Sequence, residues 1–216
     1  MKVFALLGAG TLAVVSAAFS FQIRTGEASG EETPGTNADT IQIVELVSAP
    51  APAPREPEWT RPPGPVRIAL QAGHWKAAEA PDEQAGLRNN GTRGGGKAEW
   101  EVNLDIAQRT AKILEAEGYV VDILPTTIPP GYWADLFIAI HADGNNSSSV
   151  SGYRAAAPRR DQTGRAAEFV EILERKYGEA TGLRHYPTVT RRMQGYYAFN
   201  YRRYEHALHP MTTGVI

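Results

Sequence analysis

Residues 66–75 read VRIALQAGHW, and this stretch points to the class of fold. Its first five residues form a short run rich in β-branched and apolar side chains, and a glycine and His74 follow soon after it. A short apolar run that ends in a turn is typical of a buried strand. The pattern returns at residues 136–140, LFIAI, which are apolar throughout and are followed by His141. Each predicted strand therefore has a histidine just beyond its carboxyl end.

Helical patterns separate and follow these strands. Residues 99–118 carry apolar side chains at helical spacing, and Gly118 marks the end of the predicted helix. Residues 119–127, YVVDILPTT, form another predicted strand, and residues 165–182 form a second helix with its own terminal glycine. Strands that alternate with helices predict an α/β fold, here a single three-layer domain with a mostly parallel, twisted sheet covered by helices.

The part of the chain before this domain does not have the pattern of a folded unit. Residues 1–23 begin with one lysine and continue as a mostly apolar run, which is typical of a secretory signal. The run at residues 3–21 is also long enough to span a bilayer as an uncleaved membrane anchor. Residues 24–65 are rich in Pro, Gly, Glu, Thr and Ala, which favours a disordered linker. We therefore expect one domain over residues 66–216 that is secreted, or held in the cell envelope or periplasm.

Charge and cysteine content exclude several classes of function. The net charge is −2, so no overall positive field favours nucleic acid, and we expect no nucleic-acid partner. The chain has no cysteine, which excludes disulfides, thiolate nucleophiles and cysteine-ligated zinc. Residues 184–204 are a local exception, with five arginines, no acidic residue and six interleaved aromatic side chains. This segment is either a binding surface for an anionic polymer or a solvated face with tyrosines packed beneath it.

His74, Glu99 and His141 carry the strongest indication of chemistry. In open α/β sheets, sites lie beyond the carboxyl ends of the strands, so the two histidines are expected to meet there. Glu99 stands at the start of the first predicted helix, directly after a long Gly-rich loop at residues 76–96. Two imidazoles and one carboxylate are a usual ligand set for catalytic zinc, which keeps one position open for water or substrate. The alternative is that each histidine only makes a structural hydrogen bond at the end of its strand.

The other three histidines are expected to be structural. His206 and His209 are three residues apart and would share one face of a helix, but we see no carboxylate arranged with them. Pro210 would also end a helix at this point. His185 likewise has no evident partner in the sequence. We expect all three to hold structural or peripheral positions.

Three stretches together resemble a known family. They are ALQAGHW at residues 69–75, EWEVNLDIAQRTAKILEAEGYVV at 99–121 and ADLFIAIHADGN at 134–145. In order and spacing they are similar to the zinc-dependent N-acetylmuramoyl-L-alanine amidases, which are peptidoglycan hydrolases with a single α/β domain. The family pattern has a strand that ends in Gly-His, a Glu five residues before a Leu, and a later strand that ends in His. The resemblance covers residues 66–216.

The resemblance implies that His74, Glu99 and His141 bind a zinc ion, Zn2+. Glu101 competes with Glu99 for the ligand role, and the match of residues 102–104 to Val-Asn-Leu in the family favours Glu99. If the helix starts at this point, the two carboxylates point in different directions, so both cannot easily bind the same ion.

The last eight residues, HPMTTGVI, resemble the family's approach to its last core strand. In the family, this strand continues into a glutamate that is the expected general base or acid beside the metal. That glutamate would stand just beyond Ile216. We therefore expect the sequence to be a fragment of the amidase domain, and we assign no catalytic acid or base within it.

The resemblance implies hydrolysis of the amide bond between N-acetylmuramic acid and L-alanine, with peptidoglycan as the partner. Two alternatives remain. A non-catalytic peptidoglycan-binding module would keep the fold but would not turn over substrate if it lacked the terminal glutamate. Another zinc hydrolase, such as a carboxypeptidase, would act on a peptide bond.

Overall fold

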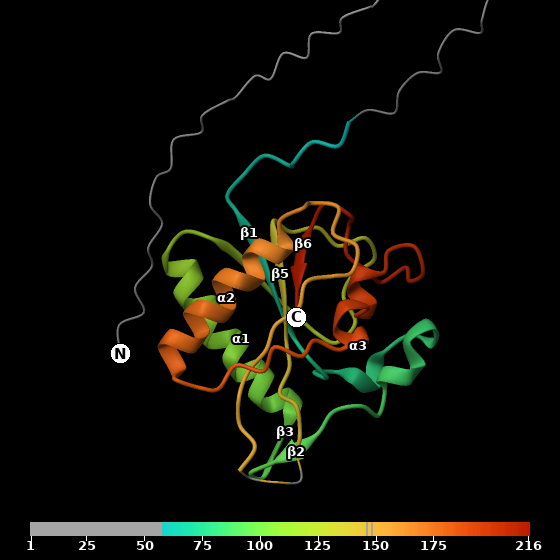
Figure 1. Ribbon diagram of the computed structural model, residues 1–216. Coiled ribbons are helices and arrows are strands. Elements are labelled where there is room, and N and C mark those ends of the chain that lie inside the picture. Colours follow the sequence, from blue (N-terminus) through green and yellow to red (C-terminus); the bar gives the residue numbers. More distant parts are fainter. Residues whose placement is uncertain (1–57, 146, 148) are drawn as a thin grey trace, which may run out of the picture. The chain divides into compact units, whose positions relative to one another are not determined.

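A computed structural model describes residues 58–145, 147 and 149–216 (Figure 1). The expected signal peptide or membrane anchor over residues 1–23 lies outside the described residues, as does the expected linker up to residue 57. The domain forms one unit, Trp59–Ile216. None of the helices in this described part combines the length and apolarity needed to cross a bilayer.

Four parallel strands form the central sheet, in the order β4-β1-β5-β6. They are β4 (Val120–Leu124), β1 (Arg67–Ala72), β5 (Leu136–Ile140) and β6 (Thr213–Val215). β1 and β5 lie in the middle and are covered on both faces, which explains why their side chains are mostly apolar. The prediction of an α/β fold with a mostly parallel sheet is confirmed. The two strands that precede His74 and His141 are neighbours in this sheet.

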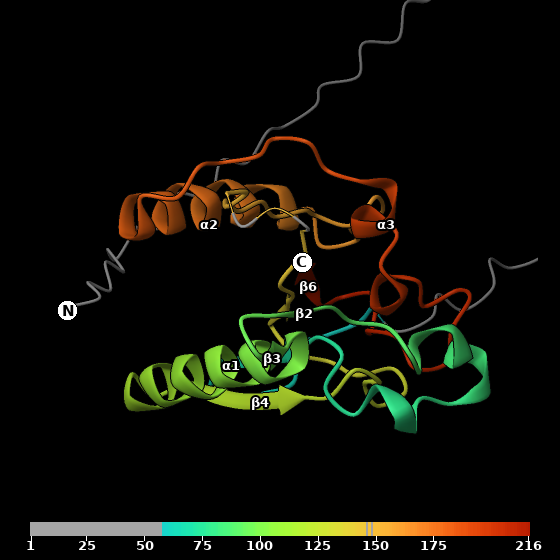
Figure 2. The same ribbon diagram turned by 90° about the horizontal axis from the view of Figure 1, so that it is seen from below.

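Helix α1 (Glu99–Ala116) covers one face of the sheet. Its small buried residues Ala107 and Ala111 pack against Ile68 and Leu70 of β1. The helix is followed by Gly118, whose φ of 89° reverses the chain into β4. Figure 2 shows α1 beside β4, whereas α2 (Ala166–Thr181) lies at the other end of the sheet, where it contacts the edge strand β6.

The opposite face carries a second and larger apolar core. Ala69 of β1 and Phe137 of β5 belong to it, whereas Ile68 and Leu70 belong to the core under α1, as the two-residue period of a strand requires. The other buried members of this second core are Leu124, Ile128, Ala134, Ala139, Tyr197, Ala198 and Leu208. Several of them come from the C-terminal part of the chain, so that part is built into the same domain.

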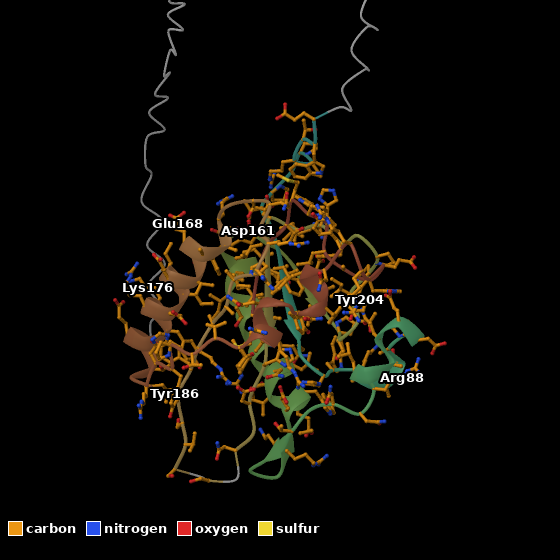
Figure 3. The ribbon with its side chains drawn as sticks, turned by 45° about the vertical axis from the view of Figure 1, so that its right-hand side comes forward. Arg88, Asp161, Glu168, Lys176, Tyr186 and Tyr204 are labelled. Carbon is orange, nitrogen blue, oxygen red and sulfur yellow. The ribbon has the colours of Figure 1, made fainter. Side chains whose placement is uncertain are left out.

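Helix α2 has clear boundaries at both ends. Asp161 precedes it, and its Oδ2 accepts a hydrogen bond from the Ala166 backbone N–H at 2.7 Å. Gly182 follows it in the left-handed conformation with a φ of 66°, as the predicted glycine stop requires. Figure 3 shows Asp161 near one end of the helix and Glu168 and Lys176 on its outer side.

Short elements complete the domain. The segment expected as one long loop contains the 3-10 helices η1 (Ala77–Glu79) and η2 (Asp82–Leu87) and the strand β2 (Arg93–Gly94). β2 pairs antiparallel with β3 (Lys97–Ala98), directly before α1. The C-terminal part adds α3 (Arg191–Gln194) and η3 (Tyr197–Phe199). The hairpin gives the start of α1 a fixed support close to the carboxyl ends of the strands (Figure 1).

Strand β6 lies at one edge of the sheet. Val215 is fully buried, as its apolar, β-branched side chain predicts. On the outer side of this strand, the Ala156 N–H donates to the Ile216 carbonyl at 2.7 Å, and the Ile216 N–H donates to the Ala156 carbonyl at 3.1 Å. This edge of the sheet is therefore covered at its last residue.

Candidate metal centre

Two strand ends and one helix start converge on a single point. His74 follows β1, His141 follows β5, and Glu99 is the first residue of α1. Each offers one potential ligand atom, and the three atoms lie within 4.8 Å of one another. The structure thus brings together the three residues that the sequence singles out. Within residues 58–145, 147 and 149–216, this is the one such group of three.

Glycines make room for the two imidazole rings. A Cβ on Gly73 would lie 2.5 Å from Cε1 of His141, which no real structure tolerates. Gly91 has a φ of 117°, and a Cβ there would lie 3.1 Å from Cγ of His74. His74 itself adopts the left-handed conformation with a φ of 63°, a region that few residues other than glycine occupy. The backbone at His74 is therefore locally strained, and this conformation places the imidazole ring in the cluster.

The rings face the same carboxylate oxygen. His141 Nδ1 lies 3.2 Å from Glu99 Oε1, and His74 Nε2 lies 3.5 Å from it. The two rings meet edge to face, with centroids 4.9 Å apart. Burial lowers the pKa of His74 and outweighs the opposite pull of the Glu99 charge, so this imidazole is neutral at neutral pH. A neutral imidazole is the form that binds a metal.

The other carboxylate oxygen of Glu99 is held by Thr92. The Thr92 N–H and its hydroxyl donate to Oε2 at 3.0 Å and 3.2 Å, while the Ala142 N–H donates to Oε1 at 3.1 Å. Burial alone would raise the pKa of Glu99, but hydrogen bonds from His141 and from these two amides bring it to about 2. The carboxylate is therefore ionised although only 6% of the residue is exposed.

This donor set fits a divalent cation. A buried carboxylate normally has a cationic partner. Among the described residues, Glu99 forms no ion pair with lysine or arginine, and the two histidines are the only groups near it that could carry a positive charge. Nitrogen and carboxylate oxygen ligands of this kind suit zinc better than calcium or magnesium, which prefer oxygen alone.

Asn103 links α1 to the turn that carries His74. It lies one helical turn after Glu99 and is fully buried. Its Nδ2 donates to the Gly73 carbonyl at 3.0 Å and lies 3.5 Å from Glu99 Oε1. The asparagine therefore fixes the distance between the helix and the turn.

Glu101 lies outside the cluster. Its Oε2 accepts a hydrogen bond from the Ala98 backbone N–H at 2.6 Å, so it caps the first turn of α1. Of the two carboxylates that compete for the ligand role in the sequence, the geometry thus places Glu99, and not Glu101, beside the histidines.

Tyr196 reaches the cluster, and Gln71 supports Tyr196 from behind, and neither gives a clear signal in the sequence. The hydroxyl of Tyr196 lies 3.4 Å from His141 Nε2 and donates to Gln71 Oε1 at 2.8 Å. Burial raises the pKa of Tyr196 well above its ordinary value, so the hydroxyl keeps its proton. Gln71 gives a weak signal, since it is a polar residue in a buried strand and needs partners. Tyr196 is separated from the ligands by more than fifty residues, and no spacing rule connects it to them.

The expectation that the remaining histidines lack carboxylate partners is wrong for two of them. His206 Nδ1 lies 2.7 Å from Glu83 Oε1, and His185 Nε2 lies 2.9 Å from Glu174 Oε1. Both partners are distant in the sequence, which is why the pattern missed them. His209 stacks on Trp59, with ring centroids 5.5 Å apart. None of these histidines belongs to a group of three potential ligands among the described residues.

The basic and aromatic segment, residues 184–204, divides into an inner and an outer part. Tyr197 is buried in the core, and Tyr196 lies against His141. The arginines stay outside, and Arg184 lies over the ring of its neighbour Tyr186 at 5.0 Å. Tyrosines thus pack inwards beneath a solvated arginine surface. The role of this surface as a wall for substrate remains a prediction.

Comparisons with known proteins add a family and several relatives. Residues 68–208 match the family model Amidase_3, described as N-acetylmuramoyl-L-alanine amidase. The chain is 31% identical to N-acetylmuramoyl-L-alanine amidase LytC of Bacillus subtilis (strain 168), with coverage of 48% of this chain and 23% of that protein. The chain thus spans less than a quarter of the length of this curated relative.

Two solved structures are also among the similar proteins. N-acetylmuramoyl-L-alanine amidase AmiC2 of Nostoc punctiforme is 18% identical, with 70% of this chain and 77% of that chain covered and a TM-score of 0.47. The CwlD amidase of Clostridioides difficile, solved in complex with the GerS lipoprotein, is 14% identical, with coverage of 69% and 79% and a TM-score of 0.43.

Proposed function

Because the chain belongs to the N-acetylmuramoyl-L-alanine amidase family, we propose that it hydrolyses the amide bond between N-acetylmuramic acid and L-alanine in peptidoglycan. The observation that carries this proposal is the convergence of His74, Glu99 and His141 within 4.8 Å. All three lie inside the matched residues 68–208. The same cluster would be of little use to a module that only binds the cell wall.

We propose zinc as the metal. His74, Glu99 and His141 would hold it as three protein ligands, which leaves a position open for water or substrate. When bound, zinc supplies a Lewis acid that polarises a carbonyl oxygen and lowers the pKa of water. The sequence offers no cysteine that would compete as a ligand.

The residues around the cluster keep its geometry and charge fixed. Thr92 and the Ala142 amide hold the Glu99 carboxylate in one orientation and in its ionised form. Asn103 holds the turn of His74 against α1. Hydrogen bonds that hold a site in one geometry reduce the reorganisation that accompanies a reaction, which is the condition for electrostatic catalysis.

No residue of the sequence is assigned as the general base of the reaction. We propose that a glutamate just beyond Ile216 is this base. The register of β6 supports it, because Val215 pairs with Ile138 in parallel, so the first two positions after Ile216 would lie opposite Ile140 and His141. A base in that position would stand at the same edge of the sheet as the metal ligands.

The proposed substrate also sets the compartment. Peptidoglycan lies outside the cytoplasm, so we propose a secreted or envelope-bound protein, with residues 1–23 as signal or anchor and 24–65 as linker. Residues 66–216 would form the catalytic domain. Nothing in the charge of this domain favours nucleic acid as a partner.

Release of stem peptides from purified peptidoglycan tests the proposed function. The zinc-loaded chain, extended past Ile216 by the residues that follow in its gene, should release peptides with a free N-terminal L-alanine. Chelation should stop the release and added zinc should restore it. Cleavage within the stem peptide instead would indicate a carboxypeptidase, and retention of peptidoglycan without any release would indicate a binding module.

A further inference from the structure

A series of hydrogen-bonded polar side chains in the protein interior runs from a backbone carbonyl to the candidate metal centre. Gln71, on the central strand β1, is fully buried. Tyr197 lies on one side of it and Tyr196 on the other, and Tyr196 reaches His141. Polar side chains inside a sheet core are costly unless each is satisfied, so their common arrangement calls for a reason.

The backbone carbonyls at the end away from the metal centre determine which group donates and which accepts in each hydrogen bond of this series. The carbonyls of Pro125 and Thr126 can only accept, and the Gln71 side-chain amide nitrogen lies 3.1 Å and 2.8 Å from them. The same nitrogen lies 2.8 Å from the Tyr197 hydroxyl, which in turn donates to the Thr126 carbonyl. The NH2 group of Gln71 must therefore face the carbonyls, and its Oε1 must face the other way.

This orientation leaves Tyr196 one possible role towards His141. Gln71 Oε1 can only accept, so the Tyr196 hydroxyl uses its single proton on it, at 2.8 Å. Towards His141 Nε2, 3.4 Å away, the same hydroxyl can then only accept. When a cation takes up the charge of Glu99, the proton of the neutral imidazole is thereby favoured on Nε2, which leaves the lone pair on Nδ1.

The opposite ring nitrogen is the one that faces the cluster. His141 Nδ1 lies 3.2 Å from Glu99 Oε1, the same oxygen that His74 Nε2 faces. Without a cation, the Glu99 carboxylate attracts a proton to Nδ1, and a metal can bind there only if that proton leaves. An acceptor at Nε2 lets the ring keep its proton on the far side and lowers the free-energy cost of metal binding.

We propose that Tyr196, oriented by Gln71, is a positioning residue that fixes the Nε2–H form of His141 and so presents Nδ1 to the metal. The inference rests on the proposed metal centre, but not on the substrate or on the base. Tyr196 does not act on substrate in this role, since its only proton is committed to Gln71.

Zinc affinity of the full chain tests this role without any need for turnover. Tyr196→Phe removes one hydroxyl and keeps the ring, and we expect zinc to bind about 10–100-fold more weakly, the usual cost of losing the outer partner of a ligand histidine. Tyr153→Phe is the matched control, because its hydroxyl also donates to a single oxygen, the Glu174 carbonyl at 2.9 Å, but has no contact with the cluster. Competition with a chromophoric chelator measures both.

Ring-nitrogen NMR separates positioning from mere stability. In the zinc-loaded protein, the proton of His141 should be found on Nε2, and in Tyr196→Phe the Nε2–H signal should shift and exchange faster with water. Gln71→Met, which frees the Tyr196 proton, should also weaken zinc binding although Tyr196 is intact. Equal zinc affinity in Tyr196→Phe and the parent chain, or a proton on Nδ1 with zinc bound, would overturn the inference. A parent chain that binds no zinc would instead refute the metal centre itself.

Discussion

The two halves of the domain differ in charge and in how their polar residues are used. Residues 66–150 carry seven Lys and Arg against eleven Asp and Glu, whereas residues 151–216 carry eleven against six. The first half supplies all three candidate ligands and buries polar residues such as Asn103 in hydrogen bonds. The second half supplies Tyr196, whose hydroxyl lies beside His141, and an outer arginine surface. Metal binding is thus expected to depend on the ligands of the first half and, in the second half, on Tyr196, whereas substrate contact is expected at the arginine surface.

The two main helices show the same contrast in packing. α1 packs closely on the sheet through Ala107 and Ala111. In α2, by contrast, Ile172 is 43% exposed and Tyr177 is 44% exposed, and a hollow of about 490 Å³ lies between this helix and the segment around Pro158. We therefore expect changes near α1 to affect the metal site and changes at α2 to affect stability alone.

The largest expected effect comes from Glu99. Glu99→Gln removes the only carboxylate of the cluster and its negative charge, so zinc affinity should fall by more than the ~100-fold that loss of an outer partner costs. Glu101→Gln is the control, because that carboxylate caps the helix two residues away and should leave zinc affinity nearly unchanged. Zinc titrations of both variants measure the difference. Similar losses in the two variants would mean that Glu99 has no special role.

A smaller effect is expected at the glycine that His141 packs against. In Gly73→Ala, the new methyl group would lie 2.5 Å from the His141 ring, so the ring must move. We expect a loss of about 1–3 kcal/mol in the free energy of unfolding, typical of overpacking, together with weaker zinc binding. Gly86→Ala is the matched control, because nothing lies within 4 Å of a Cβ at that position. Denaturant unfolding and zinc titration give the two readouts, and an unchanged zinc affinity in Gly73→Ala would contradict the geometry of the site.

The smallest effect is expected at α2, on the other side of the comparison. Asp161→Ala removes the acceptor of the Ala166 N–H and should lower the free energy of unfolding by about 1 kcal/mol, the usual value for a helix cap, without any change in zinc affinity. Denaturant unfolding at pH 7 measures the loss, with Glu168→Gln on the outer side of the helix as the control. Weaker zinc binding in Asp161→Ala would contradict the expectation that α2 affects stability alone.

The same variant has a defined pH dependence. Burial alone would raise the pKa of Asp161, but hydrogen bonds from Thr163 and Ala166 outweigh it and lower the pKa. A carboxyl with a lowered pKa in the folded state stabilises the fold above its unfolded pKa of about 4, and this contribution disappears as the pH falls through the folded value. The gap in stability between the parent chain and Asp161→Ala should therefore close in acid.

Much of the first half could be predicted from sequence, because its signals are local. The apolar runs of β1 and β5, the helical spacing of α1 and the position of each histidine after a strand are all read over a few residues. Parallel strands then bring the two histidines to one edge of the sheet, so their meeting followed from the fold class, whereas the choice of Glu99 over Glu101 came from the resemblance to the family.

The rest depends on contacts between distant residues, which no local pattern encodes. Tyr196 meets His141 only because the C-terminal part packs onto the second face of the sheet. The partners of His185 and His206 are brought near by the fold in the same way. Thr92 belongs to a Gly-rich loop whose composition alone predicts nothing about where its hydroxyl points.

Zinc content of the full chain tests the central claim most directly. Elemental analysis of the purified protein should find roughly one zinc ion per chain, because a site with three protein ligands binds a single ion. The His74→Ala, His141→Ala double variant should lose this zinc. A His185→Ala, His206→Ala double variant removes the same number of imidazoles outside the cluster and should retain the metal. Unchanged zinc content in the His74→Ala, His141→Ala variant would contradict the assignment of the metal centre.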